Sequence, residues 1–267
     1  MTTMQPFSAL PDAALRRVRG ILTDIDGTLT TDGRLPASTY LALDRLARAG
    51  LHVIPVTGRC IAWAEILTRL WPVDAIIGEN GAFYSHLHNN KLVTRFLDDE
   101  KTRAANLERI HALGEAILRE VPGSALASDQ AWHAADLAID HAEDVPPLPQ
   151  QAVERIAAMM REAGMTATVS SIHVNGWFGK HDKLSMSRLC VAELLGDDVD
   201  ANRDDWLFIG DSANDVAMFG HFPLSVGVAN VREILHLLPV TPAYVTNAAG
   251  GEGFAEMAER LLVAREG

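Results

Sequence analysis

The stretch ILTDIDGTLT, residues 21–30, joins an apolar run to two aspartates and a glycine. Asp24 and Asp26 lie two residues apart, and residues at this spacing point to the same side of a β-strand. We therefore expect both carboxylates at the carboxyl end of a strand, where Gly27 lets the chain turn. Two adjacent carboxylates repel each other unless a cation or a shared proton intervenes. Because Mg²⁺ is usually held by one or two carboxylates and substrate phosphate oxygens, the stretch predicts a magnesium site.

Two alternatives compete with a magnesium site at this stretch. A polar loop that merely ends a strand explains a bare pair of aspartates equally well. A calcium-binding EF-hand loop needs a glycine at its sixth position and a glutamate at its twelfth. Gly27 is the fourth residue counted from Asp24, so the calcium loop does not fit. The choice between loop and site depends on what the rest of the chain places nearby.

The composition limits the classes of function. The chain has 267 residues, of which 48% are hydrophobic and 22% charged, as in a globular protein with a sizeable core. A net charge of −12 argues against nucleic acid or an anionic membrane as a main partner, because both need a basic surface. With two cysteines and no apolar run of about 18 residues, we expect a cytoplasmic protein without a transmembrane helix or signal peptide.

Strands and helices alternate at both ends of the chain. Apolar runs indicate buried strands, and apolar residues at helical spacing indicate helices. The expected strands are residues 21–26, 51–56, 74–77, 205–209, 224–228 and 244–245, and the expected helices are 36–49, 60–70, 184–195, 213–219, 231–237 and 253–263. This alternation predicts an α/β fold with a doubly wound parallel sheet, in which ligands gather at the carboxyl ends of the strands.

The middle of the chain has a different order of expected strands and helices. It contains a hairpin around Asn89-Asn90, helical stretches at 101–120 and 151–163, and one alternating strand at 166–178. We predict that residues 84–179 form an inserted α+β cap domain. The catalytic core then consists of residues 1–83 and 180–267, with residues 1–20 as an N-terminal extension.

A second acidic motif, GDSANDVAMF, occupies residues 210–219. Asp211 directly follows an expected strand, and Asp215 lies four residues later, so both can face one point. Asn214 adds an amide between them. A solvated helix start explains this motif alone equally well, because aspartate is favoured at helix N-termini. Its position at a strand end, like that of Asp24, makes the two motifs together more specific than either alone.

Two further elements lie in sequence between the acidic motifs. Thr57-Gly58 ends a strand and precedes a helix, a position that suits a phosphate at a helix N-terminus. Lys183 stands just before another helix, where an ammonium offsets the charge of carboxylates and phosphate. The set therefore predicts phosphate chemistry at the end of one sheet.

In this order, the motifs resemble those of the haloacid dehalogenase superfamily, and within it the phosphatases with an inserted type IIB cap. DIDGTLT (24–30) is similar to the first motif, VTGR (56–59) to the second, Lys183 to the third and GDSANDVAM (210–218) to the fourth. Other stretches that fit the resemblance are GENGA (78–82), VGVAN (226–230) and YVTNAAGGEGF (244–254).

The lysine motif departs from the usual pattern. The family lysine is often followed by glycine, whereas Lys183 is followed by Leu184, and Lys180 lies nearby. We prefer Lys183 because Asp182-Lys183 opens the predicted helix, as in the family.

The resemblance implies an Mg²⁺-dependent phosphatase. Asp24 would attack phosphorus and form an aspartyl-phosphate, while Asp26 would act as general acid and then general base. The metal set implied is Asp24, the backbone carbonyl of Asp26, and Asp211, with Asp215 binding directly or close by. The phosphate set implied is Thr57, the Gly58 backbone amide, Lys183 and Asn214.

The cap is expected to choose the substrate. Along the predicted strand at 166–178, Ser171, His173 and Asn175 alternate with apolar residues, so one face is polar and available to sugar hydroxyls. Plain solvent exposure explains the same alternation. We therefore expect a small phosphorylated metabolite, with a sugar phosphate favoured. The alternatives are a phosphomutase, which needs cap arginines to grip a second phosphate, and a sensor that binds a phospho-ligand without catalysis.

Overall fold

The computed structural model describes residues 4–267, so residues 1–3 of the predicted N-terminal extension lie outside the described part. The strands are β1 (Gln5–Pro6), β2 (Gly20–Thr23), β3 (His52–Pro55), β4 (Ala75–Gly78), β5 (Phe83–His88), β6 (Lys91–Phe96), β7 (Ala125–Leu126), β8 (Asp136–Asp140), β9 (Thr166–Val169), β10 (His173–Trp177), β11 (Trp206–Gly210), β12 (Leu224–Gly227) and β13 (Tyr244–Val245). The α-helices are α1 (Asp12–Arg17), α2 (Ala37–Arg48), α3 (Ile61–Leu70), α4 (Glu100–Glu120), α5 (Gln150–Glu162), α6 (Lys183–Leu195), α7 (Val216–His221) and α8 (Gly250–Glu266).

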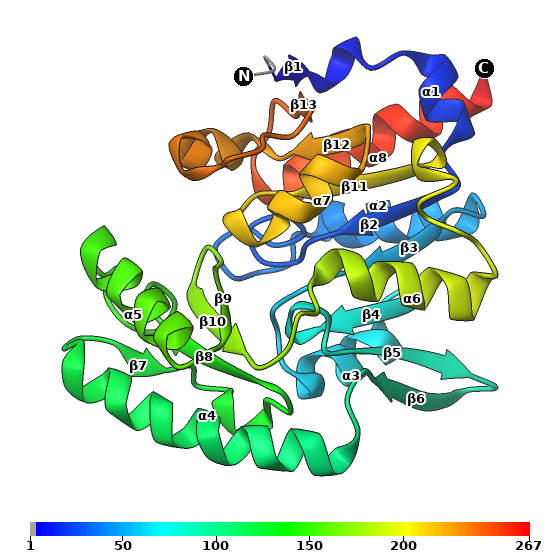
Figure 1. Ribbon diagram of the computed structural model, residues 1–267. Helices are drawn as coiled ribbons and strands as arrows, with labels where there is room; N and C mark the ends of the chain where they lie inside the picture. Colours follow the sequence, from blue (N-terminus) through cyan, green and yellow to red (C-terminus); the bar gives the residue numbers. More distant parts are fainter. Residues whose placement is uncertain (1–3) are drawn as a thin grey trace.

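One parallel sheet forms the centre of the molecule (Figure 1). Its strand order is β1-β13-β12-β11-β2-β3, and every pair in it is parallel. Strands from both ends of the chain thus share one sheet, because β2 lies between β3 and β11. The predicted α/β fold with a doubly wound parallel sheet is confirmed.

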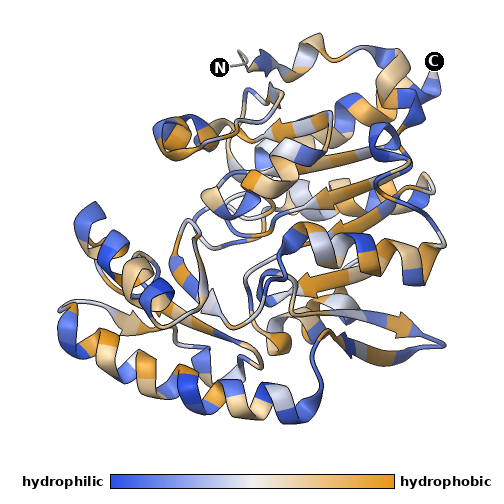
Figure 2. Ribbon diagram, viewed as in Figure 1, coloured by the Kyte–Doolittle hydropathy of each residue, from blue (hydrophilic) through white to orange (hydrophobic). Residues whose placement is uncertain are grey.

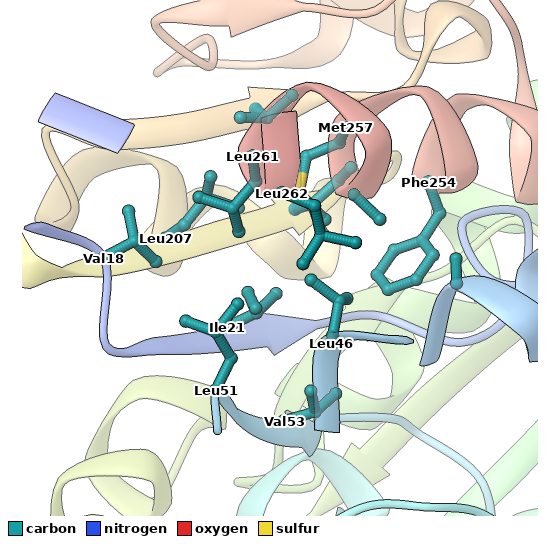
Figure 3. Close-up of a cluster of buried hydrophobic side chains, with 14 of the residues drawn as sticks. Val18, Ile21, Leu46, Leu51, Val53, Leu207, Phe254, Met257, Leu261 and Leu262 are labelled. Carbon is teal, nitrogen blue, oxygen red and sulfur yellow. The ribbon is translucent and has the colours of Figure 1, made fainter. Parts of the chain in front are cut away.

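Helices cover both faces of this sheet, which is why its strands read as continuous apolar runs. Figure 2 shows these strands as mainly hydrophobic. On one face, Ile21 and Leu207 pack against α2 and α8, and Figure 3 shows Leu262 of α8 pointing toward Leu46 of α2. On the other face, apolar side chains of the strands pack against α6 and α7. The strands are therefore packed on both faces, which fixes the points from which the loops at their carboxyl ends start.

The hairpin β5–β6 belongs beside the core sheet rather than in the cap. β5 pairs antiparallel with both β4 and β6. A parallel bridge between Val56, just after β3, and Ile77 of β4 joins this hairpin sheet to the core. Phe83 explains the placement, since its buried ring packs with Ala64 and Ile76 of the core. Our expectation that the hairpin opens the cap was wrong, although the cap as a whole stays a predicted domain.

The cap has its own antiparallel sheet, in the order β7-β8-β10-β9. Its apolar face packs against α4 and α5 through side chains such as Ile139 and Val174. The single strand expected at 166–178 is in fact two strands, because the chain turns at residues 170–172 and pairs Val174 with Val169. Figure 1 shows the cap, in green, beside the core.

The segment before β2 completes one edge of the core. β1 pairs with β13, and α1 packs beside α8 with an ion pair between Asp12 and Arg260. The predicted extension is therefore, from residue 4 onward, part of the core. Among residues 4–267, none of the helices is both long and apolar enough to cross a membrane.

Candidate active site

Three carboxylates meet at the carboxyl end of the sheet. Asp24 follows β2 and Asp211 follows the neighbouring strand β11, so parallel pairing brings them together. Asp215 joins them from the 3-10 turn η5 (Ala213–Asp215). Ligand oxygens of the three residues lie within 4.8 Å of one another, and all three side chains are buried. The structure thus brings together the residues of both acidic motifs.

Lys183 lies at the centre of this cluster. Its Nζ donates to Asp24 Oδ1 at 2.6 Å and to Asp215 Oδ1 at 2.8 Å, and its side chain is 1% exposed. The position follows from the start of α6, where the Asp182 side chain accepts from the Ser185 amide and fixes the first turn. Lys180 is exposed, so the buried contacts with the aspartates are made by Lys183.

The remaining oxygens of the cluster are held by fixed donors. Asp215 Oδ2 accepts from the amides of Asp211 and Ser212, and Asp211 Oδ2 accepts from Asn230 Nδ2 at 2.7 Å. Gly27 is required beside them, because its φ is +77° and a Cβ there would lie 2.3 Å from Asp211 Oδ2. The carboxylates therefore have little freedom to move apart.

Electrostatics in this cluster favour a cation. Burial raises the pKa of Asp24 to about 7, with Lys183 opposing and Asp215 and Asp26 adding to the rise. Burial and the charge of Asp24 also raise the pKa of Asp211 well above its usual range. One ammonium faces three buried carboxylates, so negative charge is in excess. Oxygen ligands of this kind and spacing fit Mg²⁺.

Asp26 points to a different partner. Both of its carboxylate oxygens accept from Arg59, with Arg59 Nη2 to Oδ1 at 2.8 Å and Nε to Oδ2 at 3.0 Å. Such a fork is the strong form of an arginine–carboxylate pair. The same guanidinium reaches Glu143 of the cap, so the pair links core and cap.

Donors for a phosphate lie around Thr57 and Gly58. Thr57 is buried, and its Oγ1 accepts from the Arg59 amide at 3.0 Å, which shapes the turn before α3. Asn80 Nδ2 is buried, and within residues 4–267 it has no hydrogen-bond partner. A Cβ on Gly58 would lie 3.1 Å from that nitrogen. An unpaired buried donor is costly unless a ligand completes it, so Asn80 suits an anion here.

A small cavity of about 10 Å³ lies over Asp24 and Asp26. Core and cap share its walls, which comprise Asp24, Asp26, Gly58, Arg59, Ser170, Ser171, Ile172, His173, Asn175 and Asn214. The three cap residues expected from the sequence thus face the acidic motifs, although Ser171 comes from the turn rather than from a strand. Asn175 Nδ2 donates to the buried Asp136 at 3.1 Å, which fixes the direction of its amide.

Hydrogen bonds to buried carboxylates form the joint between core and cap. Buried Glu79 of the core accepts from the cap amides of Ala134 (2.9 Å) and Ala135 (2.6 Å). In the cap, both ring nitrogens of His133 face carboxylates, with Asp136 at 2.5 Å and Asp129 at 3.3 Å. These contacts hold the cap turn that carries Asp136, and Asp136 in turn orients Asn175. The joint therefore helps to position the cavity wall.

We expect this joint to weaken as the pH rises. Burial alone would lower the pKa of His133, but Asp136 and Asp129 raise it well above the usual value near 6.5. A raised histidine pKa contributes stability that is complete below pH 6.5 and is lost as the pH rises through the folded value. His133→Gln should therefore lower the free energy of unfolding by about 3 kcal/mol at pH 6.5 and by less at pH 9.

Denaturant unfolding of wild type and variant at pH 6.5, 7.5 and 9 measures this difference. Burial and the charge of Asp136 raise the pKa of Glu79 to about 7. Ionisation of Glu79 therefore also lowers the free energy of unfolding as the pH rises, but only up to about pH 7. The decline above pH 7.5 is therefore diagnostic for His133. His111→Gln, on the exposed side of α4, is the matched control. A difference that stays constant from pH 6.5 to 9 would contradict a charged His133.

Some residues at the site were not in the predicted set. Asn80, Arg59 and Asn230 all lie within motifs quoted above, but the sequence does not show that their side chains turn inward. Glu143 lies in a polar loop of the cap and carries no sequence signal at all. Its contact with Arg59 arises only when the cap folds onto the core.

Comparison with known proteins places the chain in a family. Residues 21–111 match the family model of haloacid dehalogenase-like hydrolases. A phosphoglycolate phosphatase of Methanothermobacter thermautotrophicus is 30% identical over 247 residues, covering 92% of this chain and 99% of that protein. The chain belongs to the haloacid dehalogenase superfamily. It is a phosphatase, as the phosphatase names of its relatives and the motif residues gathered at the sheet end indicate.

Solved structures of this superfamily share the fold. A sugar phosphatase of subclass IIB aligns with a TM-score of 0.62 at 14% identity, covering 92% of this chain and 100% of that one. The sucrose-phosphatase of Synechocystis sp. aligns with a TM-score of 0.63 at 18% identity, covering 92% and 98%. At these identities the likeness concerns the fold, including a cap inserted in the same kind of core. The resemblance stated from the motifs is confirmed.

Proposed function

We propose that this phosphatase depends on Mg²⁺ and hydrolyses a small phosphorylated acid, with phosphoglycolate as the favoured substrate. The observation that carries the proposal is the buried cluster of Asp24, Asp211, Asp215 and Lys183 beneath a cavity that also exposes Asp26. Nucleophile, proton donor and positive charge then act on one phosphoryl group. A phospho-ligand sensor would gain little from this combination.

The proposed reaction has two steps at phosphorus. Asp24 attacks the phosphoryl group and displaces the ester oxygen, which Asp26 protonates as it leaves. Asp26 then takes a proton from water, and the resulting attack on the aspartyl-phosphate restores Asp24 and releases phosphate. Thr57, the Gly58 amide, Lys183 and Asn214 would hold the phosphate oxygens, and Asn80 Nδ2 adds a donor.

Asp24, Asp211 and Asp215, with the backbone carbonyl of Asp26, would hold the metal. Mg²⁺ bound there supplies positive charge that offsets the charge of the transferring phosphoryl group. The excess of carboxylates over ammonium groups at this point supports the assignment. The Lys183 ammonium contacts Asp24 and Asp215, so Lys183 and the metal would together neutralise these carboxylates.

The cavity of about 10 Å³ is too small for any phosphate ester, so the cap must open for every substrate, and the cavity's size does not choose among them. The choice of a small acid rests on a relative. The relative from Methanothermobacter carries the name phosphoglycolate phosphatase. A sugar phosphate, the class favoured by the sequence, remains the second candidate, because hydroxyls of Ser170 and Ser171 line the cavity.

A phosphomutase needs cationic side chains in the cap that reach the cavity. The cap arginines have other partners: Arg155 pairs with Glu120 and Glu162, and Arg109 stacks on Phe178. Arg59, which does line the cavity, comes from the core and pairs with Asp26. Hydrolysis is therefore the reaction that we propose.

Phosphate release from a panel of phosphorylated acids and sugars, with Mg²⁺ present, tests the proposal. We expect phosphoglycolate to give the highest kcat/KM. EDTA should lower the rate at least about 100-fold, and added Mg²⁺ should restore it, because the buried carboxylates lose their counter-charge. Turnover that persists after exhaustive chelation would remove the metal from the proposal. A sugar phosphate that exceeds phosphoglycolate would reassign the substrate.

A further inference from the structure

Glu143 occupies an unusual position for a cap glutamate. It lies just after β8, in a turn whose backbone is fixed by the buried Asp140 side chain. Asp140 accepts from the amides of Ala142 (2.9 Å), Glu143 (2.8 Å) and Asp144 (2.8 Å). Three such bonds to one carboxylate make a rigid turn. The Glu143 side chain is therefore presented to the core in a defined direction.

The Glu143 carboxylate bridges two basic groups across the joint. Its Oε1 lies 2.6 Å from Arg59 Nη2 of the core, and its Oε2 lies 2.9 Å from His173 Nε2 of the cap. The Arg59 and His173 side chains are only 13% and 6% exposed. Hydrogen bonding to His173 and Arg59 lowers the pKa of Glu143 to about 2, so the bridge is ionised near neutral pH.

One carboxylate thus contacts both basic groups of the joint. Arg59 Nη2 and His173 Nε2 point at the two oxygens of Glu143, so together they present donors spaced for a single carboxylate. Both Arg59 and His173 line the cavity over Asp24. The pair thus has capacity for an anion that reaches it from the cavity.

The location matches the free end of a short phosphorylated acid. The Arg59 guanidinium contacts both Asp26 and Glu143. Asp26 is the proposed proton donor to the leaving oxygen. In phosphoglycolate, one CH₂ separates the leaving oxygen from the carboxyl carbon, a span of about 2.5 Å over two single bonds. When the leaving oxygen is at Asp26, the substrate carboxylate lies within reach of Arg59.

We propose that Arg59 and His173 form the binding site for the carboxylate of the substrate, and that Glu143 fills this site until substrate displaces it. The inference rests on the proposed function, because it concerns the non-reacting end of the same substrate. It makes Arg59, His173 and Glu143 the residues that select an acid over a neutral phosphoester. The bidentate geometry of arginine with a carboxylate explains why the core supplies Arg59 here.

The test compares phosphoglycolate with ethyl phosphate, which has the same number of carbons and no carboxylate. The readout is the ratio of kcat/KM for the two substrates, with KM and kcat measured separately. Glu143→Gln removes the competing charge and should raise the ratio about fivefold, through KM for phosphoglycolate. His173→Gln removes the ring nitrogen that faces the carboxylate and should lower the ratio about tenfold. Glu154→Gln, on the exposed face of α5, is the matched control and should leave the ratio unchanged.

The outcomes separate the two proposals. If the wild type does not prefer phosphoglycolate to ethyl phosphate, the proposed substrate fails, and the carboxylate site fails with it. If the wild type does prefer it but both variants alter the two substrates equally, only the carboxylate site is overturned. Equal gains for both substrates in Glu143→Gln would show that Glu143 merely holds the cap closed. Opposite shifts of the ratio in the two variants support the site.

Discussion

Replacement of Asp24 by asparagine is expected to lower kcat for phosphate release by roughly 10⁴-fold or more, because the amide cannot form the covalent intermediate. Asparagine keeps the size of the side chain and still offers an oxygen to Lys183 Nζ, which lies 2.6 Å from Asp24 Oδ1. The substitution also removes one of three like charges from a buried cluster. The unfolding temperature should therefore stay the same or rise, while activity disappears.

Single-turnover phosphate release and thermal unfolding, measured on the same preparation, check both halves of this expectation. Asp32→Asn is the matched control, since Asp32 is an exposed aspartate in the next turn of the chain. It should leave kcat unchanged. If Asp24→Asn keeps a tenth or more of the wild-type rate, Asp24 is not the nucleophile. If it unfolds at a much lower temperature than the wild type, the loss of activity says nothing about chemistry.

Replacement of Lys183 by methionine should damage both stability and catalysis. Two buried carboxylates, Asp24 and Asp215, would lose the ammonium that contacts them at 2.6 and 2.8 Å. Removal of one partner from a buried ion pair costs about 3–5 kcal/mol of folding free energy. The same ammonium is proposed to hold the phosphate, so kcat/KM should fall about 100-fold to 1,000-fold.

Urea unfolding and steady-state kinetics, each with and without Mg²⁺, measure these losses. Lys180→Met is the control, because Lys180 is exposed and only three residues away. We expect little change in that variant. The opposite result, a large loss in Lys180→Met and none in Lys183→Met, would move the lysine motif to residue 180. Partial recovery of the stability of Lys183→Met by Mg²⁺ is expected, since the metal would bind the same carboxylates.

The sequence was most informative where function and local geometry coincide. Asp24 and Asp26 stand two apart at the end of an apolar run, and Asp211 follows another such run, so parallel pairing of β2 with β11 was enough to bring both motifs together. The core strands could also be predicted from the sequence, because a strand that is buried on both faces needs a continuous apolar stretch. The hairpin β5–β6 was assigned to the cap because a hairpin pattern in the sequence does not reveal which sheet the hairpin joins.

The sequence by itself determined the α/β core, the motif order and hence the superfamily, because these depend on spacing along the chain. Only the tertiary structure decided that Arg59 pairs with Asp26, that Glu143 bridges Arg59 and His173, and that the chain turns at Ser171 instead of continuing as a strand. The contact between Arg59 and Glu143 joins segments 84 residues apart across the core–cap joint. A contact of that kind depends on how two separately packed units meet, and no local periodicity records it.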